Sequence, residues 1–447
     1  NRLVRVRTLG ARDNAIELGQ ECDQNQFIQC AALNFSRTWF HVAAASGTMA
    51  PATNFWTGGV LAPVPAVSNG IAVSTGVLMG ARTGRIYVSN SVFVASGPAH
   101  PVYYVSADAI RGDYNCYYVP YSNAFAWVAP ALPPAFGVEI RTPGSLGEWA
   151  EWMQCESNSM MADPLFADLA GGDLHPRSQG GRYVPASAGF EADEETSPLI
   201  DAADPLAPWS LEPGPNGGRA DIGPYGNRPL GSRTPTNGTY VLLTFNQGGV
   251  ARGTQTLRWV ARGGATNVGH QVLIQVSTNS GVNYQTLGTN FASQMTFAWH
   301  TTNTASGAAV RWRVRDTIEP TWLAFSDRDF TIHNSNLTYY VNDAATNGDA
   351  FTTAPGAAGN SGLTPDSPVL SLREVLNRYD VEPGDTILVD VGGYGQAAPV
   401  ELGYPDGGTV AEPVVIRGGT NSPGTVFSGA GIEVENARSV RLRDLRF

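Results

Sequence analysis

The clearest pattern of apolar and polar positions lies between residues 239 and 334. Several runs there alternate, and in the run 255–261 the residues Leu257, Trp259 and Ala261 fall on one side. Alternation with a period of two is the pattern of a half-buried strand. Two further runs show the same arrangement, with Val272, Ile274 and Val276 in one and Val310, Trp312 and Val314 in the other. Some six strands of this kind in about a hundred residues predict a β-sandwich.

Three basic residues alternate with the core positions of the last run. Arg311, Arg313 and Arg315 fall on the side opposite the core. We expect them on a solvated strand face, with contact to an anionic glycan as the alternative.

Residues 1 to 120 carry shorter apolar runs that end at Gly, Asn or Ser. Such runs are typical of strands with tight corners. Their irregular spacing favours stacked coils with variable loops over the even hairpins of a sandwich. We expect Asn14, Asn25, Asn34 and Asn90 at the corners, because Asn tolerates the left-handed conformation. A polar row that binds sugar is the alternative.

The stretch from Ala162 to Asn227 is crowded with Pro, Gly and Asp and has only short apolar runs. It lacks an amphipathic period with which to build its own core. We therefore expect an ordered wrap that lies against the preceding coils, in which acidic side chains cap turns. The residues given this role are Asp163, Asp168, Asp173, Asp201, Asp204 and Asp221.

Four motifs in this stretch resemble, in order, the C-terminal end of secreted bacterial right-handed parallel β-helix proteins. They are Asp163-Pro-Leu-Phe, Gly172-Asp-Leu-His, the run 196–205 and the run 215–226. Residues 114–159 are similar to the last coils of the same family, in which a short helix precedes the Asp-Pro-Leu-Phe turn. We expect Trp149 and Trp152 of that helix to pack on the coils, with a sugar-binding platform as the alternative.

Two later segments carry further resemblances. The run 276–287 is similar to a hairpin of secreted bacterial fibronectin-III-like or immunoglobulin-like modules, which act as spacers or adhesion units. After residue 336, the motifs Tyr339-Tyr-Val-Asn-Asp, the run 359–368 and the run 383–394 resemble the opening of a parallel β-helix.

A helix is predicted among these opening motifs. Ser371 and Glu374 form a capping box, and one face is apolar. The residues of that face are Leu372, Val375, Leu376 and Tyr379. Such a helix would cover the first coil and hide its edge strands.

Together these patterns predict an all-β chain in which right-handed parallel β-helix segments flank an immunoglobulin- or fibronectin-III-like β-sandwich. Residues 1–228 are expected to be the C-terminal part of a β-helix with its wrap, residues 229–335 the sandwich, and residues 336–447 the cap helix and first coils of a second β-helix. Since the end of one β-helix precedes the start of another, we expect a fragment of a tandem array.

Composition and charge limit the classes of partner that the protein is expected to bind. Charged residues make up only 15% of the chain, beside 51 Gly and 30 Pro, which fits many turns and little surface helix. The net charge of −11 argues against nucleic acid and anionic membranes as partners. No run of 18 apolar residues is present, so we expect no membrane insertion. The resemblance implies an extracellular or cell-surface location.

The four cysteines are too few for a disulfide scaffold in a chain of 447 residues. We expect Cys22, Cys30, Cys116 and Cys155 to be buried thiols of the coils, with a bridge as the alternative. No CxxC motif is present and the six His are scattered, which argues against zinc.

No residue receives a catalytic or cofactor-binding role, and the metal ligands stay open, with Ca²⁺ as the candidate ion. Neither the carboxylates and base of a polysaccharide lyase nor the carboxylate pair of a glycoside hydrolase is recognisable. The acidic residues Glu191, Asp193, Glu194 and Glu195 are expected in a solvated loop, with Ca²⁺ binding as the alternative. Asp343, Asp349 and Asp366 are a second candidate for Ca²⁺, although their spacing misses the EF-hand pattern.

The expected function is that of an extracellular structural or adhesive repeat protein that forms a surface layer or fibre. Self-association through β-helix ends or tandem copies would build the assembly. The alternatives are a carbohydrate-active enzyme, lyase or hydrolase, with its site on middle coils, and a glycan-binding module. Polysaccharide is the further candidate partner.

Overall fold

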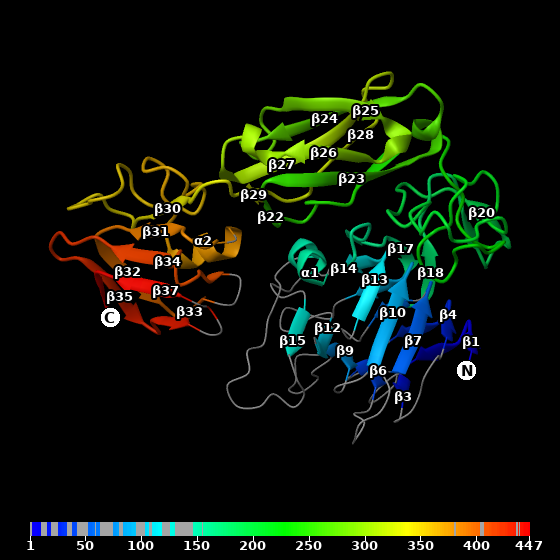
Figure 1. The fold of residues 1–447 in the computed structure, drawn as a ribbon, viewed down its shortest axis with the longest axis horizontal. Coiled ribbons are helices and arrows are strands. Elements are labelled where there is room, and N and C mark those ends of the chain that lie inside the picture. The colour runs from blue at the N-terminus through cyan, green and yellow to red at the C-terminus, as the bar shows by residue number, and fades with distance from the viewer. Residues whose placement is uncertain are drawn as a thin grey trace.

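The structure is a computed structural model. It describes residues 2–9, 16–18, 26–33, 38–42, 52–58, 60–62, 75–79, 84–94, 103–106, 110–118, 126–129, 146–153, 155–379, 381–402, 406–434, 437 and 439–447. The described chain is predominantly β-strand with few helices, which confirms the all-β class. Its strands form three parts, which we call the first coil stack, the two-sheet module and the second coil stack (Figure 1).

The first coil stack consists of coils that contribute one strand to each of three parallel sheets. The first sheet holds β1 (Arg2–Val4), β4 (Gln26–Ile28), β7 (Ala52–Thr57), β10 (Gly84–Ser89) and β13 (Ile110–Asp113). The second holds β2 (Arg7–Leu9), β5 (Ala31–Leu33), β8 (Val60–Ala62), β11 (Val92–Val94), β14 (Cys116–Tyr118) and β16 (Met160–Met161). The third holds β3 (Ile16–Leu18), β6 (Thr38–Val42), β9 (Thr75–Met79), β12 (Tyr103–Ser106) and β15 (Ala126–Ala129).

Equivalent residues of neighbouring coils stack inside this part. Phe93 of β11 pairs in register with Tyr117 of β14, and their rings stack with centroids 5.0 Å apart. Both side chains are buried. The short apolar runs therefore supply inward side chains that stack from each coil to the next.

The corner between the first and second sheets is made by residues with positive φ. Arg5, Gln29, Gly58, Asn90 and Tyr114 take this conformation in successive coils. The corner position expected for Asn90 is confirmed, whereas Asn14, Asn25 and Asn34 lie outside the described residues. A tight corner needs a residue that leaves the extended conformation, which Gly and Asn do at little cost.

The wrap, residues 162–227, follows the helix α1 (Leu146–Met153) and lies against the coils, as predicted. It contains two short hairpins, β17 (Phe166–Asp168) with β18 (Asp173–Pro176) and β19 (Arg182–Val184) with β20 (Gly189–Glu191). Leu174, Leu199 and Ile222 share a core with Val92 and Cys116 of the second sheet. The wrap also bonds to the corner, because Gly223 N donates to Asn90 O at 2.8 Å.

The two-sheet module has one sheet of β21 (Thr239–Leu242), β23 (Thr254–Arg262) and β26 (Thr296–His300). The other sheet runs through β22 (Val250–Ala251), β29 (Phe330–Ile332), β27 (Gly307–Asp316), β24 (Gln271–Ser277) and β25 (Gln285–Phe291), with β28 (Leu323–Phe325) beside β27. Short 3-10 turns lie at Gly263–Thr266, Ala292–Gln294 and Thr301–Asn303. The predicted inward positions share one buried core, in which Trp259 and Trp312 are 1% and 0% exposed.

The second coil stack also has three parallel sheets. They hold β30 (Thr338–Val341), β31 (Thr386–Val389), β34 (Val414–Gly418) and β37 (Val440–Arg443); β32 (Gly392–Gln396), β35 (Thr425–Gly429) and β38 (Leu445–Arg446); and β33 (Val400–Leu402) with β36 (Ile432–Val434). The predicted helix is α2 (Leu372–Arg378), which packs on β30 and β33, the first strands of their sheets. Ser371 caps it by accepting from Glu374 N, which confirms that half of the predicted capping box, whereas Glu374 Oε2 accepts from Leu370 N. Neither described helix is long and apolar enough to cross a membrane.

Buried contacts join the two-sheet module to both neighbours. On one side, Leu243 and Val260 enter the core of the wrap. On the other side, His333 Nε2 lies 2.8 Å from Asp385 Oδ1, and Ala308 belongs to the core of the second coil stack. The three parts are therefore held together by buried contacts as well as by the covalent chain.

The described cysteines are free thiols. Cys30 and Cys116 are buried in the first coil stack, as expected, and Cys155 is half-buried. Burial raises the pKa of Cys116 far above its usual value and that of Cys155 to about 12. Both thiols are therefore held protonated and unreactive at neutral pH. Cys22 lies outside the described residues.

Candidate metal centre

Local turn capping explains several acidic residues of the wrap. Asp163 Oδ1 accepts from Leu165 N at 2.9 Å, and Asp168 Oδ1 accepts from Gly171 N at 2.8 Å. Asp204 Oδ1 likewise accepts from Leu206 N at 2.9 Å. These carboxylates stabilise turns two or three residues long, which is the role that the sequence predicted.

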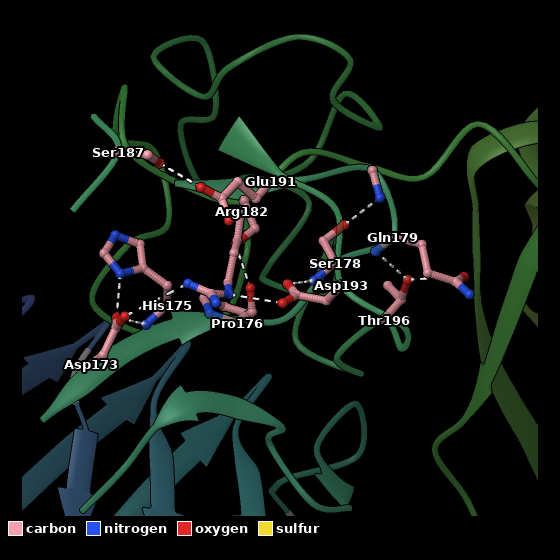
Figure 2. Close-up of polar contacts among 12 residues, drawn as sticks. Asp173, His175, Pro176, Ser178, Gln179, Arg182, Ser187, Glu191, Asp193 and Thr196 are labelled. Carbon is pink, nitrogen blue, oxygen red and sulfur yellow. Dashed lines mark hydrogen bonds and ion pairs between the residues drawn. The ribbon is translucent and has the colours of Figure 1, made fainter. Parts of the chain in front are cut away.

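The acidic residues near β20 are also engaged, as Figure 2 shows. Asp193 lies between two partners: its Oδ2 accepts from Ser178 N at 2.9 Å, and its Oδ1 pairs with Arg182 Nε at 3.0 Å. Glu191 accepts from the Ser187 hydroxyl at 2.6 Å. Glu194 and Glu195 stay exposed. This segment is thus a loop fastened by Asp193, with its carboxylates directed to separate partners.

A second pair in the same view joins Asp173 and His175. His175 Nδ1 lies 2.5 Å from Asp173 Oδ1 (Figure 2). The His175 ring also stacks on Tyr225, with centroids 3.7 Å apart. Burial lowers the pKa of His175, so the ring is neutral at neutral pH. A neutral, stacked ring 3% exposed fits a packing role within the wrap.

Three other carboxylates of the wrap converge. Among the described residues, only Asp201, Glu212 and Asp221 form a group of three His, Cys, Asp or Glu whose potential ligand atoms all lie within 4.8 Å of one another. Each of the three is at most 6% exposed. They come from separate segments of the wrap, so the group exists only in the folded chain.

Backbone hydrogen bonds bring the segments that carry Asp201 and Asp221 together. Ala203 N donates to Ala220 O at 3.0 Å, and Ile222 N donates to Leu199 O at 2.9 Å. Asp201 and Asp221 occupy the middle of these two segments and therefore face each other. Glu212 enters from the intervening loop, which also carries the exposed residue Leu206.

Each carboxylate uses one oxygen to hold a distant backbone N–H. Asp221 Oδ1 accepts from Asp201 N at 3.0 Å, and Glu212 Oε1 accepts from Asp221 N at 2.9 Å and Asn227 N at 2.8 Å. Asp201 Oδ1 accepts from Gly217 N at 3.0 Å, and its carboxylate also accepts from the Thr234 hydroxyl. The backbone of the wrap is thereby tied around the group.

Two oxygens of the group are left over. Glu212 Oε2 and Asp221 Oδ2 are buried and have no hydrogen-bond partner. Burial raises the pKa of Glu212 and of Asp221, and the charge of Glu212 raises that of Asp221 further. Burial also raises the pKa of Asp201. Three buried acids at this spacing cannot all stay ionised without an added positive charge.

Two arginines lie near the group without bonding to its carboxylates. Arg262 is buried, and its guanidinium donates to Ser197 O at 2.6 Å and Ile200 O at 3.1 Å. Burial lowers the pKa of Arg262 to about 10, so it stays charged at neutral pH. Arg219 is half-buried and donates to Ala202 O and Ala203 O. Both cations favour ionisation of Asp201 from a distance.

The carboxylate of Asp201 also restricts which residue can occupy position 217. A Cβ at Gly217 would lie 2.4 Å from Asp201 Oδ2, too close for any real contact. Only glycine therefore fits where the chain passes over this carboxylate.

The other predicted calcium ligands are not brought together in this way. Asp343 caps Ala345 N and Gly393 N, and Asp349 accepts from Asn342 Nδ2 at 2.7 Å. Asp366 is exposed on a separate turn. The three do not form a carboxylate group of the kind found in the wrap.

The arginines of β27 are half-buried on the face opposite the core. Arg311 Nε pairs with Asp329 at 2.7 Å, and Arg313 lies 3.8 Å from the ring centroid of Tyr284. The charges of Arg311 and Arg313 thus meet partners within the module, and the strand face expected to be solvated is only half-exposed. Trp149 of α1 is fully buried, as expected, whereas the side chain of Trp152 lies outside the description.

No protein-family model, no curated protein and no solved structure matches this chain.

Sequence reasoning placed Asp201 and Asp221 in the wrap but missed Glu212. This residue stands in Leu211-Glu-Pro-Gly-Pro, which has the composition of an exposed turn. Asp201 and Asp221 were assigned to turn capping, but they bond to backbone groups 16 and 20 residues away. The convergence depends on non-local pairing, which no local signal reports.

Proposed function

We propose that the protein is an extracellular structural and adhesive repeat protein that forms a surface layer or fibre. In this proposal the coil stacks are parts of right-handed parallel β-helices, and the two-sheet module is an immunoglobulin- or fibronectin-III-like sandwich. Location and assembly follow from the sequence resemblance.

The observation that carries the proposal is that the same coil design stands on both sides of the two-sheet module. Each stack has three parallel sheets, and each has a corner between the first two that is made by a residue with positive φ. Arg5 holds this place between β1 and β2, and Asp444 holds it between β37 and β38. The two stacks therefore share one corner design.

The outer edges of the two stacks suit such continuation. Val4 of β1 is 43% exposed and Leu442 of β37 is 41% exposed. Unpaired parallel strands with exposed apolar side chains accept further strands by β-augmentation. We assign these edges to self-association with another copy of the chain.

Rigid joints support a load-bearing role as well. Arg262 fastens the two-sheet module to the wrap, and the pair His333 and Asp385 fastens it to the second coil stack. Buried, charge-assisted contacts of this kind restrict hinge motion between the parts.

Electron microscopy of the native material tests this function. We expect continuous fibres or layers in which coil stacks and two-sheet modules alternate. Discrete particles that cleave polysaccharide would overturn the proposal in favour of the enzyme.

The purified chain gives a second test through its edge strand. Sedimentation velocity should show association that rises with concentration, and Leu442→Lys should abolish it because an edge lysine blocks strand pairing. The control Val410→Lys changes a more exposed apolar residue, 87% exposed, outside any strand and should associate like the wild type. Equal association of both variants would contradict assembly through β37.

A further inference from the structure

We propose that Asp201, Glu212 and Asp221 bind one hard divalent cation, with Ca²⁺ as the preferred ion, and that this ion locks the wrap in place beneath the two-sheet module.

The two unpartnered oxygens point to a ligand. Asp221 and Glu212 are 2% and 6% exposed, yet no described residue donates to Asp221 Oδ2 or Glu212 Oε2. A buried carboxylate oxygen normally accepts a hydrogen bond, because leaving it bare is costly. The other oxygen of each side chain accepts from backbone N–H groups, so the bare oxygens are the ones available to a ligand.

A cation satisfies this arrangement more completely than a proton. One shared proton joins the bare oxygens of Glu212 and Asp221 but still leaves two of the three buried carboxyl groups charged. A cation contacts all three at once, since oxygen ligands of Ca²⁺ lie about 2.3–2.6 Å from the ion and hence at most about 5 Å apart. The 4.8 Å limit within which the three ligand atoms fall is compatible with that span.

The charges of the site also suit a positive ion. Asp201, Glu212 and Asp221 contribute three negative charges when ionised, and Arg262 and Arg219 contribute two positive charges nearby. The group therefore keeps a negative charge, which favours a cation over a neutral or anionic ligand.

The ligand chemistry selects among divalent ions. All three ligands are carboxylates, which suit Ca²⁺, Mg²⁺ and Mn²⁺ rather than zinc or copper. Mg²⁺ keeps several waters and demands octahedral geometry, whereas Ca²⁺ accepts irregular sets of protein oxygens. A site closed by the backbone of the wrap therefore favours Ca²⁺.

The ion would act on a specific loop. Residues 204–219 connect Asp201 to Asp221 and expose Leu206, Trp209 and Leu211. Glu212 is the member of the group that this loop supplies. Binding would therefore fix the loop against the pair of segments that Arg262 joins to the two-sheet module.

Calorimetric titration of the EDTA-treated, dialysed full chain with CaCl₂ tests the proposal. We expect one equivalent of Ca²⁺ to bind and the melting temperature to rise with Ca²⁺ concentration. Glu212→Gln and Asp221→Asn should each weaken binding at least tenfold. The matched control Asp168→Asn changes an exposed carboxylate of the wrap and should bind like the wild type.

Folding of the variants is checked in the same series. In EDTA, both Glu212→Gln and Asp221→Asn should melt at or above the wild-type temperature, because each removes a buried negative charge. If the wild type neither binds Ca²⁺ nor gains stability at millimolar concentrations, the proposal is overturned. It is also overturned if folded Glu212→Gln and Asp221→Asn bind as tightly as the control.

Discussion

Two buried carboxylates in different parts of the chain have opposite environments. Asp390, next to β31 in the second coil stack, accepts from the backbone N–H groups of Ala350, Phe351 and Thr352 at 2.6–2.9 Å. Asp221 in the wrap accepts from one backbone N–H, that of Asp201. Both side chains are at most 2% exposed. Burial alone therefore does not distinguish them, but the number of donors does.

The consequence appears in their protonation. Burial opposes the charge of Asp390, but the hydrogen bonds from Ala350 and Phe351 outweigh it and lower the pKa. For Asp221, burial and the neighbouring Glu212 raise the pKa, and one hydrogen bond cannot compensate. A buried carboxylate that accepts several hydrogen bonds is stable in its charged form. A buried carboxylate that accepts only one needs a proton or a cation to neutralise its charge.

The largest expected effect on stability follows from removing Asp390, the one of the two acids that accepts more backbone hydrogen bonds. Asp390→Ala leaves the N–H groups of Ala350, Phe351 and Thr352 without their acceptor. We expect the free energy of unfolding to fall by about 4 kcal/mol, since each buried unsatisfied donor costs about 1–3 kcal/mol. Urea denaturation measures the change. The exposed Asp366→Ala should leave it nearly unchanged, and equal effects of the two would refute the comparison.

Glu156 is intermediate between Asp390 and Asp221, because it accepts several hydrogen bonds but its pKa is still raised. It accepts from Asn115 Nδ2, Tyr117 Oη and Ser159 Oγ, yet burial outweighs these bonds and raises its pKa from 4.5 to about 7. The folded chain then holds a proton that the unfolded chain releases between pH 4.5 and 7. The stabilising contribution is complete below pH 4.5 and lost as pH rises through 7, by about 3 kcal/mol at 1.36 kcal/mol per pKa unit.

Unfolding of the first coil stack measured from pH 4.5 to 8 checks this pH dependence. The wild type should lose stability as pH rises relative to Glu156→Gln, which carries no titrating group at this position. Parallel curves for the two proteins would show that burial does not dominate at Glu156.

The smallest expected effect belongs to an acid near the surface. Asp329 pairs with Arg311, and both side chains are 28% exposed. Solvent screens such a pair, so a double-mutant cycle of Asp329→Ala and Arg311→Ala should give a coupling of about 0.5 kcal/mol. A coupling near that of a buried pair, about 3 kcal/mol, would mean that exposure does not rank these acids as argued.

The sequence predicted the parts of the fold that local patterns control. The alternation of Leu257, Trp259 and Ala261 identified a strand and its buried side, and Ser371 with Glu374 identified the start of α2. The turn caps at Asp163 and Asp168 were also correct, because their partners lie two or three residues away.

The candidate metal centre could not be found in this manner. Its ligands Asp201, Glu212 and Asp221 meet because segments 199–203 and 220–222 pair and the loop between them folds beneath. Glu212, flanked by Leu211 and Pro213, has the sequence context of a solvated turn. Its burial is a property of the folded wrap rather than of its neighbours in sequence.

The most direct test of this account is a crystal structure of the protein grown with Ca²⁺, with anomalous difference density measured to locate the ion. The account predicts one peak among Asp201, Glu212 and Asp221, with carboxylate oxygens about 2.3–2.6 Å from it. An empty site at saturating Ca²⁺, with the three carboxyl groups bonded to one another through protons, would contradict it.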